Sequence, residues 1–231
     1  MNVKIIRWEP GNKSNSGEAL INRRAFDENA EETARKVLAD IKVNGNKAII
    51  KYVKRFDRIS LRTADFSVSK AELTKAWACV DKEIRKAVDE SHKRITTFSR
   101  AGMKKNWTMP SGNGGMLGEQ FTPLDRVGVY VPGGTAPLVS TALMTVTLAK
   151  VAGVSEIVAC TPCRKDKKVN PVLLYALKKA GATEIYKVGG IQAIGMMAYG
   201  TQTIRKVQKI VGPGNAYVTA AKRQVYGQVA L

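Results

Sequence analysis

The stretch RVGVYVPGGTAP, residues 126–137, decides how this 231-residue chain folds. It opens with an alternating apolar run at 127–131, which is typical of a strand, and the run stops at the Pro-Gly-Gly turn 132–134. The apolar segment 138–151 that follows is long enough for a helix. A strand, a glycine turn and a helix in this order place backbone N–H groups at the carboxyl end of a strand, where open α/β sheets bind ligands.

The same unit recurs three more times downstream. Strands are predicted at 127–131, 156–160, 184–188 and 207–211, and helices at 137–151, 170–180, 192–199 and 215–226. Gly153 and Gly181 each follow a helix, where a left-handed cap is expected. Four such units with short turns and apolar strands predict an α/β fold, namely a Rossmann-like parallel sheet with flanking helices.

The region before this sheet is predicted to be mostly helical and carries no motif for chemistry. Residues 1–25 are partly glycine-, asparagine- and serine-rich and indicate an extended arm, whereas 26–56 has helical periodicity interrupted at Gly45. Ser69, with Glu72 three residues later, predicts a capping box. We therefore divide the chain into a helical N-terminal region (1–101), a glycine-rich crossover segment that is irregular or forms short paired strands (102–125), and a Rossmann-like nucleotide-binding domain (126–231).

Composition and charge narrow the class of protein. Hydrophobic residues make up 44% and charged residues 25%, and neither a membrane span nor a signal peptide is evident, so a cytoplasmic protein without membrane association is expected. Lys plus Arg total 38 against 19 acidic residues, a net charge of +19. The densest basic cluster, 164–168, has no interleaved aromatics, so we favour a solvated basic surface over nucleic-acid binding. An acidic segment or partner outside this chain is a third interpretation.

Polar side chains stand at the ligand-facing turns of the predicted sheet. Three of the four turns after the strands are glycine-rich, which allows close backbone approach to a ligand, yet none is a GxGxxG or GxxxxGK[ST] loop. Tyr130, Gln192 and Asn215 occupy these turns and could bond a ribose, phosphate or amide. The acidic residues Glu156 and Glu184 start strands, so they are expected at the opposite edge.

Cysteine and histidine give little support for catalysis or metal binding. Three cysteines are too few for a disulfide framework, and Cys160 with Cys163 forms a CxxC that could be redox-active or half of a zinc site. A basic loop separates this pair from its helix and no second ligand pair follows, so we favour plain cysteines. The only histidine, His92, is predicted to be a surface residue. No catalytic residue and no metal ligand is predicted in this chain.

Three segments of the chain resemble the histidinol dehydrogenase family. They are RVGVYVPGGTAPLVSTALMTVTLAKVAGV, KVGGIQAIGMMAYGTQTI and KIVGPGNAYVTAAKRQV. The resemblance implies a zinc-dependent, NAD-using oxidoreductase of histidine biosynthesis, generally a homodimer, that converts L-histidinol through the aldehyde to L-histidine. It also implies that Tyr130, Gln192 and Asn215 contact NAD.

The departures from the family concern its second half. The family's zinc ligands (Gln, His, Asp, His) and its Glu-His acid/base pair come after the GPGN helix, and the sequence ends at Leu231. The resemblance therefore covers the N-terminal half and implies an NAD-binding half that is inactive alone. Cys163, where proline is common, and the net charge of +19 are further departures. A non-catalytic or split-enzyme nucleotide-binding relative, and a basic nucleic-acid-binding protein, are the alternatives.

Overall fold

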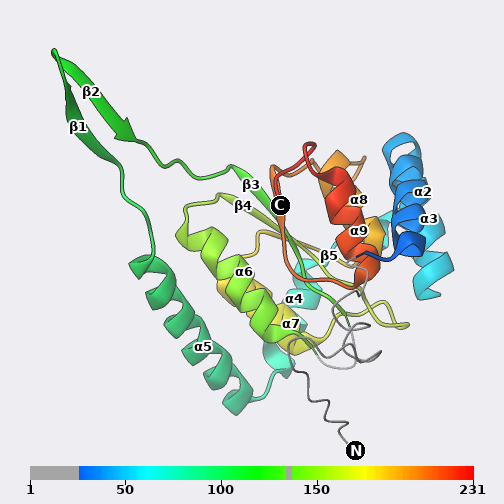
Figure 1. The fold of residues 1–231 in the computed structure, drawn as a ribbon. Coiled ribbons are helices and arrows are strands. Elements are labelled where there is room, and N and C mark those ends of the chain that lie inside the picture. The colour runs from blue at the N-terminus through cyan, green and yellow to red at the C-terminus, as the bar shows by residue number, and fades with distance from the viewer. Residues whose placement is uncertain (1–25, 134–136) are drawn as a thin grey trace, which may run out of the picture.

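A parallel sheet of short apolar strands lies at the centre of the computed structural model, which describes residues 26–133 and 137–231 (Figure 1). Its strand order is β5-β4-β3-β6. The strands are β3 (Arg126–Tyr130), β4 (Glu156–Cys160), β5 (Glu184–Tyr186) and β6 (Lys209–Val211). Parallel pairing of β3 with β4 sets Tyr130 beside Cys160 at the carboxyl edge. The predicted Rossmann-like parallel sheet is confirmed.

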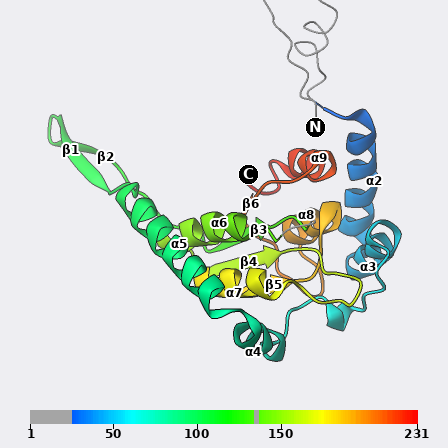
Figure 2. The same cartoon turned by 90° about the horizontal axis from the view of Figure 1, so that it is seen from below.

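Alternating side chains of the strands divide the core into two layers. Val127 and Val129 of β3 pack with the helices α6 (Val139–Val151) and α7 (Pro171–Ala180). Tyr130 packs on the other face, with α8 (Gly190–Tyr199) and α9 (Ala216–Val225). Gly128 faces this second layer, where a Cβ atom would lie 2.6 Å from Met197 Sδ. The period of two along β3 therefore explains why helices cover both faces of the sheet (Figure 2).

The first helices of the described chain extend the second layer. Helix α2 (Glu28–Asn44), which Asp27 caps, buries one apolar stripe against α8 and α9, and Gly45 separates it from α3 (Asn46–Tyr52). A π-helical turn, η1 (Val53–Asp57), follows directly. Figure 2 shows α2 and α3 beside α8. The predicted helical region is confirmed, while the extended arm predicted for 1–25 lies outside the described residues.

An extended segment and a capped helix attach the helical region to the sheet edge. The Val68 backbone N–H donates to Ile185 O at 2.8 Å, so residues 66–68 pair with β5. A 3₁₀ turn, η2 (Thr63–Asp65), precedes this segment, and α4 (Lys70–Cys79) follows it. The predicted capping box is present, because Glu72 N donates to Ser69 Oγ and Ser69 N donates to the Glu72 carboxylate. Glu72 also accepts a 2.9 Å bond from the buried Lys187 Nζ just after β5.

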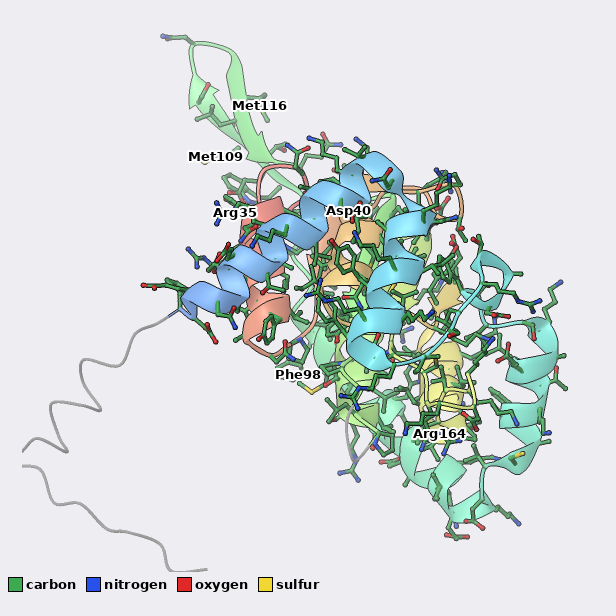
Figure 3. All side chains as sticks on the ribbon, turned by 90° about the vertical axis from the view of Figure 1, so that its right-hand side faces the viewer. Arg35, Asp40, Phe98, Met109, Met116 and Arg164 are labelled. Atoms are coloured by element: carbon green, nitrogen blue, oxygen red, sulfur yellow. The ribbon has the colours of Figure 1, made fainter. Side chains whose placement is uncertain are left out.

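A projecting hairpin follows the longest described helix. Helix α5 (Lys82–Ala101) leads to the antiparallel strands β1 (Trp107–Gly112) and β2 (Gly115–Glu119), as predicted for the crossover segment. Every residue of both strands is exposed, and the hairpin extends away from the sheet (Figures 1 and 3). Met109 and Met116 are 50% and 61% exposed. None of the helices in the described ranges is long and apolar enough to cross a membrane.

A buried guanidinium joins three strands at the amino edge of the sheet. The Arg126 side chain is only 6% exposed and donates to both Glu156 and Glu184, the latter through Nη2 at 2.9 Å. Glu156 also accepts from Arg205, and Glu184 from the Tyr186 hydroxyl. Hydrogen bonds from Arg126 lower the pKa of Glu184. The acidic residues at the strand starts therefore lie opposite the ligand edge, as expected, and are used in ion pairs.

Candidate functional site

A cavity of about 390 Å³ lies where α2 and the η1 turn meet the first turns of α8 and α9; we call it the α2–α8 cavity. Its volume is within the range of ligand pockets in proteins. Its walls combine aromatic rings, cations, one carboxylate and two carboxamides: Tyr52, Phe56, Tyr217, Lys36, Arg55, Asp57, Gln192 and Asn215. This mixture of flat apolar faces and hydrogen-bonding groups suits a ligand with an aromatic base and charged or hydroxylated parts.

Gln192 is the most buried polar group of this cavity, at 1% exposure. It stands in the first turn of α8, which begins at Gly190 with the left-handed φ of +63°. The Gln192 Nε2 group donates to Asp57 Oδ2 across 3.4 Å. The long contact joins two segments far apart in the sequence and holds the carboxamide at the cavity wall.

Tyr130 reaches the same place from the end of β3. Its hydroxyl accepts a 3.1 Å bond from the backbone N–H of Gly190, which is part of the cavity wall, although Tyr130 itself is not. Burial raises the pKa of Tyr130, so the phenol is neutral near pH 7 and keeps its own proton for donation. Tyr130 therefore positions the start of α8.

Asn215 caps the helix on the other side of the cavity. Its Oδ1 atom accepts from Val218 N at 3.1 Å at the start of α9. The cap uses the oxygen, and the two N–H groups of the same carboxamide remain suited to an acceptor such as a phosphate or carbonyl oxygen. The structure thus brings Tyr130, Gln192 and Asn215 to one end of the sheet; their contact with a cofactor stays a prediction.

In the ligand-facing turns, packing between the turns explains why the residues are glycines, whereas the sequence predicted close approach of a ligand. A Cβ atom on Gly133 would overlap Pro162, and one on Gly189 would lie 2.6 Å from the same proline. A Cβ atom on Gly212, whose φ is +116°, would overlap the main chain of Tyr130. These glycines let the turns pack against one another, so their presence alone does not indicate a ligand.

A second cavity of about 540 Å³ lies beside the turns that follow β3 and β4; we call it the basic cavity. Arg164 (labelled in Figure 3), Lys165 and Lys168 line it, so the basic cluster of the sequence faces a hollow. The Thr161 hydroxyl also lines it, buried and without a hydrogen-bond partner in the described part of the chain. Asp57 belongs to the walls of both cavities.

The cysteines and the histidine are not gathered into a site. Cys160 is fully buried and burial raises its pKa, while Cys163 is half-buried with a pKa raised for the same reason. His92 lies partly exposed on α5 and lines neither cavity, and burial lowers its pKa. Within residues 26–133 and 137–231 no three His, Cys, Asp or Glu side chains are grouped so that they could hold a metal ion.

The helical region contributes residues to this site that no pattern in the sequence predicts. Lys36, Arg55 and Asp57 come from a segment without a recognisable motif. They reach the cavity because α2 packs against α8 and α9, more than a hundred residues later in the chain. The one local signal is the end of a helix at Asp57, which by itself does not indicate a binding residue.

A Rossmann-like sheet with a polar cavity at the carboxyl ends of its strands makes this chain an α/β protein with a cavity at the edge where such folds bind ligands. The sequence pattern of histidinol dehydrogenase matches residues 21–231. The chain therefore belongs to the histidinol dehydrogenase family.

Individual relatives agree with this assignment. Histidinol dehydrogenase 2 of Trichormus variabilis is 45% identical over 201 residues, which are 87% of this chain and 46% of that protein. Histidinol dehydrogenase of Methanosarcina mazei is 45% identical over 207 residues, 89% and 47% respectively. The crystal structure of histidinol dehydrogenase from Elizabethkingia anophelis superposes with a TM-score of 0.85 at 39% identity, covering 95% of this chain and 51% of that one. The chain spans about half the length of the relatives it matches.

Proposed function

We propose that this chain is the NAD-binding part of an enzyme that oxidises L-histidinol, through the aldehyde, to L-histidine. The observation that carries the proposal is the convergence of Gln192, Asn215 and the Tyr130–Gly190 contact on one cavity. These are the three positions to which the family resemblance assigns NAD contacts. Membership of the family supports the proposed reaction. The residues that line the cavity support the proposal that this part of the enzyme binds NAD.

The groups around the site fit a dinucleotide. Tyr52 and Phe56 stack with ring centroids 5.6 Å apart, and Phe56 is 42% exposed, so this aromatic pair offers apolar surface to a base. Lys36 and Arg55 supply positive charge for a pyrophosphate. The buried Thr161 hydroxyl in the adjoining basic cavity, which has no partner among the described residues, offers a further hydrogen bond. NAD, when bound, would supply the hydride acceptor for alcohol oxidation.

The side chains of this chain would bind and orient the cofactor. The Gln192 and Asn215 carboxamides donate to its oxygens, and Tyr130 fixes the first turn of α8 against which it lies. Among the described residues that line the α2–α8 cavity there is no histidine or cysteine, and the full sequence contains one histidine. We therefore propose binding without turnover by the isolated chain, with zinc and the acid/base groups supplied by sequence equivalent to the second half of the relatives.

The test is isothermal titration calorimetry of the 231-residue chain with NAD. Gln192→Ala should weaken binding about 10- to 100-fold, because it removes a buried hydrogen-bonding group. Lys36→Ala should weaken it about 10-fold. Arg35→Ala is the matched control, because Arg35 lies on the same helix (Figure 3), carries the same charge and lines neither cavity.

Two results would contradict the proposal. Unchanged NAD affinity in Gln192→Ala and Lys36→Ala would remove the α2–α8 cavity as the binding site. Histidinol oxidation by the chain alone, at a rate typical of complete enzymes, would overturn the proposed division of labour.

We propose that an apolar surface contacts sequence equivalent to the second half of the relatives. Met144 and Leu148 of α6 are 58% and 50% exposed, and with Phe121 and Leu124 at the base of the hairpin they line a hollow of about 490 Å³. Such a contiguous apolar surface marks an interaction site. Co-expression with the second half of the Methanosarcina mazei relative should give co-purification that Leu148→Glu abolishes. A homodimer of this chain alone, seen by light scattering and lost in Leu148→Glu, would assign the surface to self-association instead.

A further inference from the structure

Among the residues that the structure describes, Asp57 is the one acidic residue that lines the two cavities, and it lines both. The other charged side chains that line them, within residues 26–133 and 137–231, are cationic: Lys36, Arg55, Arg164, Lys165 and Lys168. In a chain of net charge +19, a lone carboxylate between two basic walls lowers the affinity for any anion that comes close to it. A carboxylate in this place therefore calls for a ligand that donates hydrogen bonds to it.

The backbone holds Asp57 in a defined place. It is the last residue of the η1 π-helical turn, and Arg58 follows in the left-handed conformation with φ +57°. π-Helical turns are rare and frequently occur at functional sites. On its other side, Asp57 contacts Gln192, to which the family resemblance assigns a cofactor contact. The η1 turn thus places the Asp57 carboxylate, which belongs to the helical region, in the wall shared by the two cavities.

The bonding capacity of this carboxylate is largely unused. Among the described residues Asp57 forms no ion pair, and the 3.4 Å contact from Gln192 Nε2 is the one hydrogen bond that it accepts. An ionised carboxylate can accept about four hydrogen bonds. Burial raises the pKa of Asp57, which means that the charged form is held there at a cost to the folded state. A structural carboxylate would instead be paired, as Asp65 is with Arg62 and Lys167.

Building on the NAD-binding role proposed above, we infer that Asp57 accepts hydrogen bonds from the vicinal hydroxyls of a ribose of NAD and thereby selects NAD over NADP. The two hydroxyls of a ribose match the two oxygens of a carboxylate, as in dinucleotide-binding folds where an acidic residue bonds the ribose 2′-hydroxyl. A 2′-phosphate removes one of these donors and sets a second anion against the carboxylate. Asp57 stands outside the three cofactor positions that the resemblance implies.

A purely structural role for Asp57 makes a different prediction. If the carboxylate only held the Gln192 carboxamide in place, its loss would weaken NAD and NADP equally. If the carboxylate bonds the ribose hydroxyls, Asp57→Asn should weaken NAD binding and strengthen NADP binding, because Arg164 and Lys165 line the same cavity and their positive charge is then unopposed by Asp57. The ratio of the two affinities, not either one alone, therefore distinguishes the roles.

The experiment measures the dissociation constants of NAD and NADP for the 231-residue chain and its variants by calorimetry at constant ionic strength. The wild-type chain should prefer NAD by about 100-fold, and Asp57→Asn should reduce the preference to about 10-fold or less. Asp40→Asn is the matched control: it also removes one carboxylate of the helical region (Figure 3), but Asp40 is paired with Lys51 and lines neither cavity. It should leave the ratio unchanged.

Thermal melting adds a readout that does not depend on the ligand. Because Asp57 is half-buried and has no ionic partner among the described residues, Asp57→Asn should melt at or above the wild-type temperature. A melting temperature several degrees lower would show a structural carboxylate and overturn the inference.

The inference and the proposed function fail in different ways. Loss of NAD binding in Gln192→Ala, with an unchanged NAD-to-NADP ratio in Asp57→Asn, would overturn the role of Asp57 and leave the NAD site standing. Absence of NAD binding by the wild-type chain would overturn the proposed function, and the role of Asp57 with it.

Discussion

Replacing Arg126 by methionine should destabilise the fold without touching the candidate site. The Arg126 guanidinium is nearly fully buried and joins the starts of β3, β4 and β5 through Glu156 and Glu184. Methionine keeps much of the side-chain volume and removes the charge. The substitution therefore leaves Glu184, which is only 33% exposed, close to a second carboxylate and without its cation.

The size of the effect follows from this geometry. Breaking a buried ion pair by removing one partner costs about 3–5 kcal/mol, and partial solvation of Glu184 reduces this to about 2–3 kcal/mol. In a chain of this size each kcal/mol shifts the melting temperature by about 2–4 °C, so a decrease of about 4–12 °C is expected. Glu156 keeps Arg205 as a partner and contributes less.

Differential scanning calorimetry across pH checks the cause. Arg126 lowers the pKa of Glu184 in the folded state, so its stabilisation is fully present above the unfolded-state pKa of about 4.3 and is lost as pH falls through the folded-state pKa. The difference between wild type and Arg126→Met should therefore be largest near pH 7 and shrink below about pH 4. Arg205→Met is the control, because Arg205 is 73% exposed and its loss should change the melting temperature little. Equal melting temperatures for the two variants at pH 7 would refute this reasoning.

Two further predictions concern the ligand edge. Gly212→Ala should cost about 2–5 kcal/mol in urea unfolding, because its Cβ overlaps the Tyr130 main chain at a left-handed φ, whereas Gly227→Ala, with open space around it, should cost about 1–2 kcal/mol; similar costs would contradict the packing argument. Ellman's reagent should modify the exposed Cys79 fast, Cys163 slowly, and Cys160 only on unfolding, because burial raises the pKa of the last two thiols; fast reaction of Cys160 would contradict this.

Local sequence patterns predict helices, strands and caps because interactions between residues close in the sequence form these elements. The strand at 156–160 has its predicted bounds, and the Ser69–Glu72 capping box is present, since each depends on neighbouring residues. The strand predicted at 207–211 is shorter, Lys209–Val211, because Val207 N bonds Met197 O of α8 instead of joining the ladder. Apolar periodicity cannot distinguish a ladder residue from one that packs beside it.

The site was less accessible to sequence reasoning than the fold. The turns pointed to Gln192 and Asn215 because the carboxyl ends of parallel strands share one edge. The glycines in these turns predict room for a ligand, but position 212 requires glycine because the Tyr130 main chain packs against it. Asp57 could not be placed, because its position depends on how α2 packs on α8 and α9, which no local pattern encodes.

The packing of the turns around Pro162 has a consequence for how the ligand edge tolerates change. Gly133, in the turn after β3, and Gly189, in the turn after β5, both pack against this proline. A shift in one turn therefore displaces the others. Their substitutions should show coupling energies in double-mutant cycles instead of adding independently. A larger residue in one turn can then be accepted only together with a compensating substitution in a neighbouring turn. The turns at this edge therefore change shape together and not one at a time.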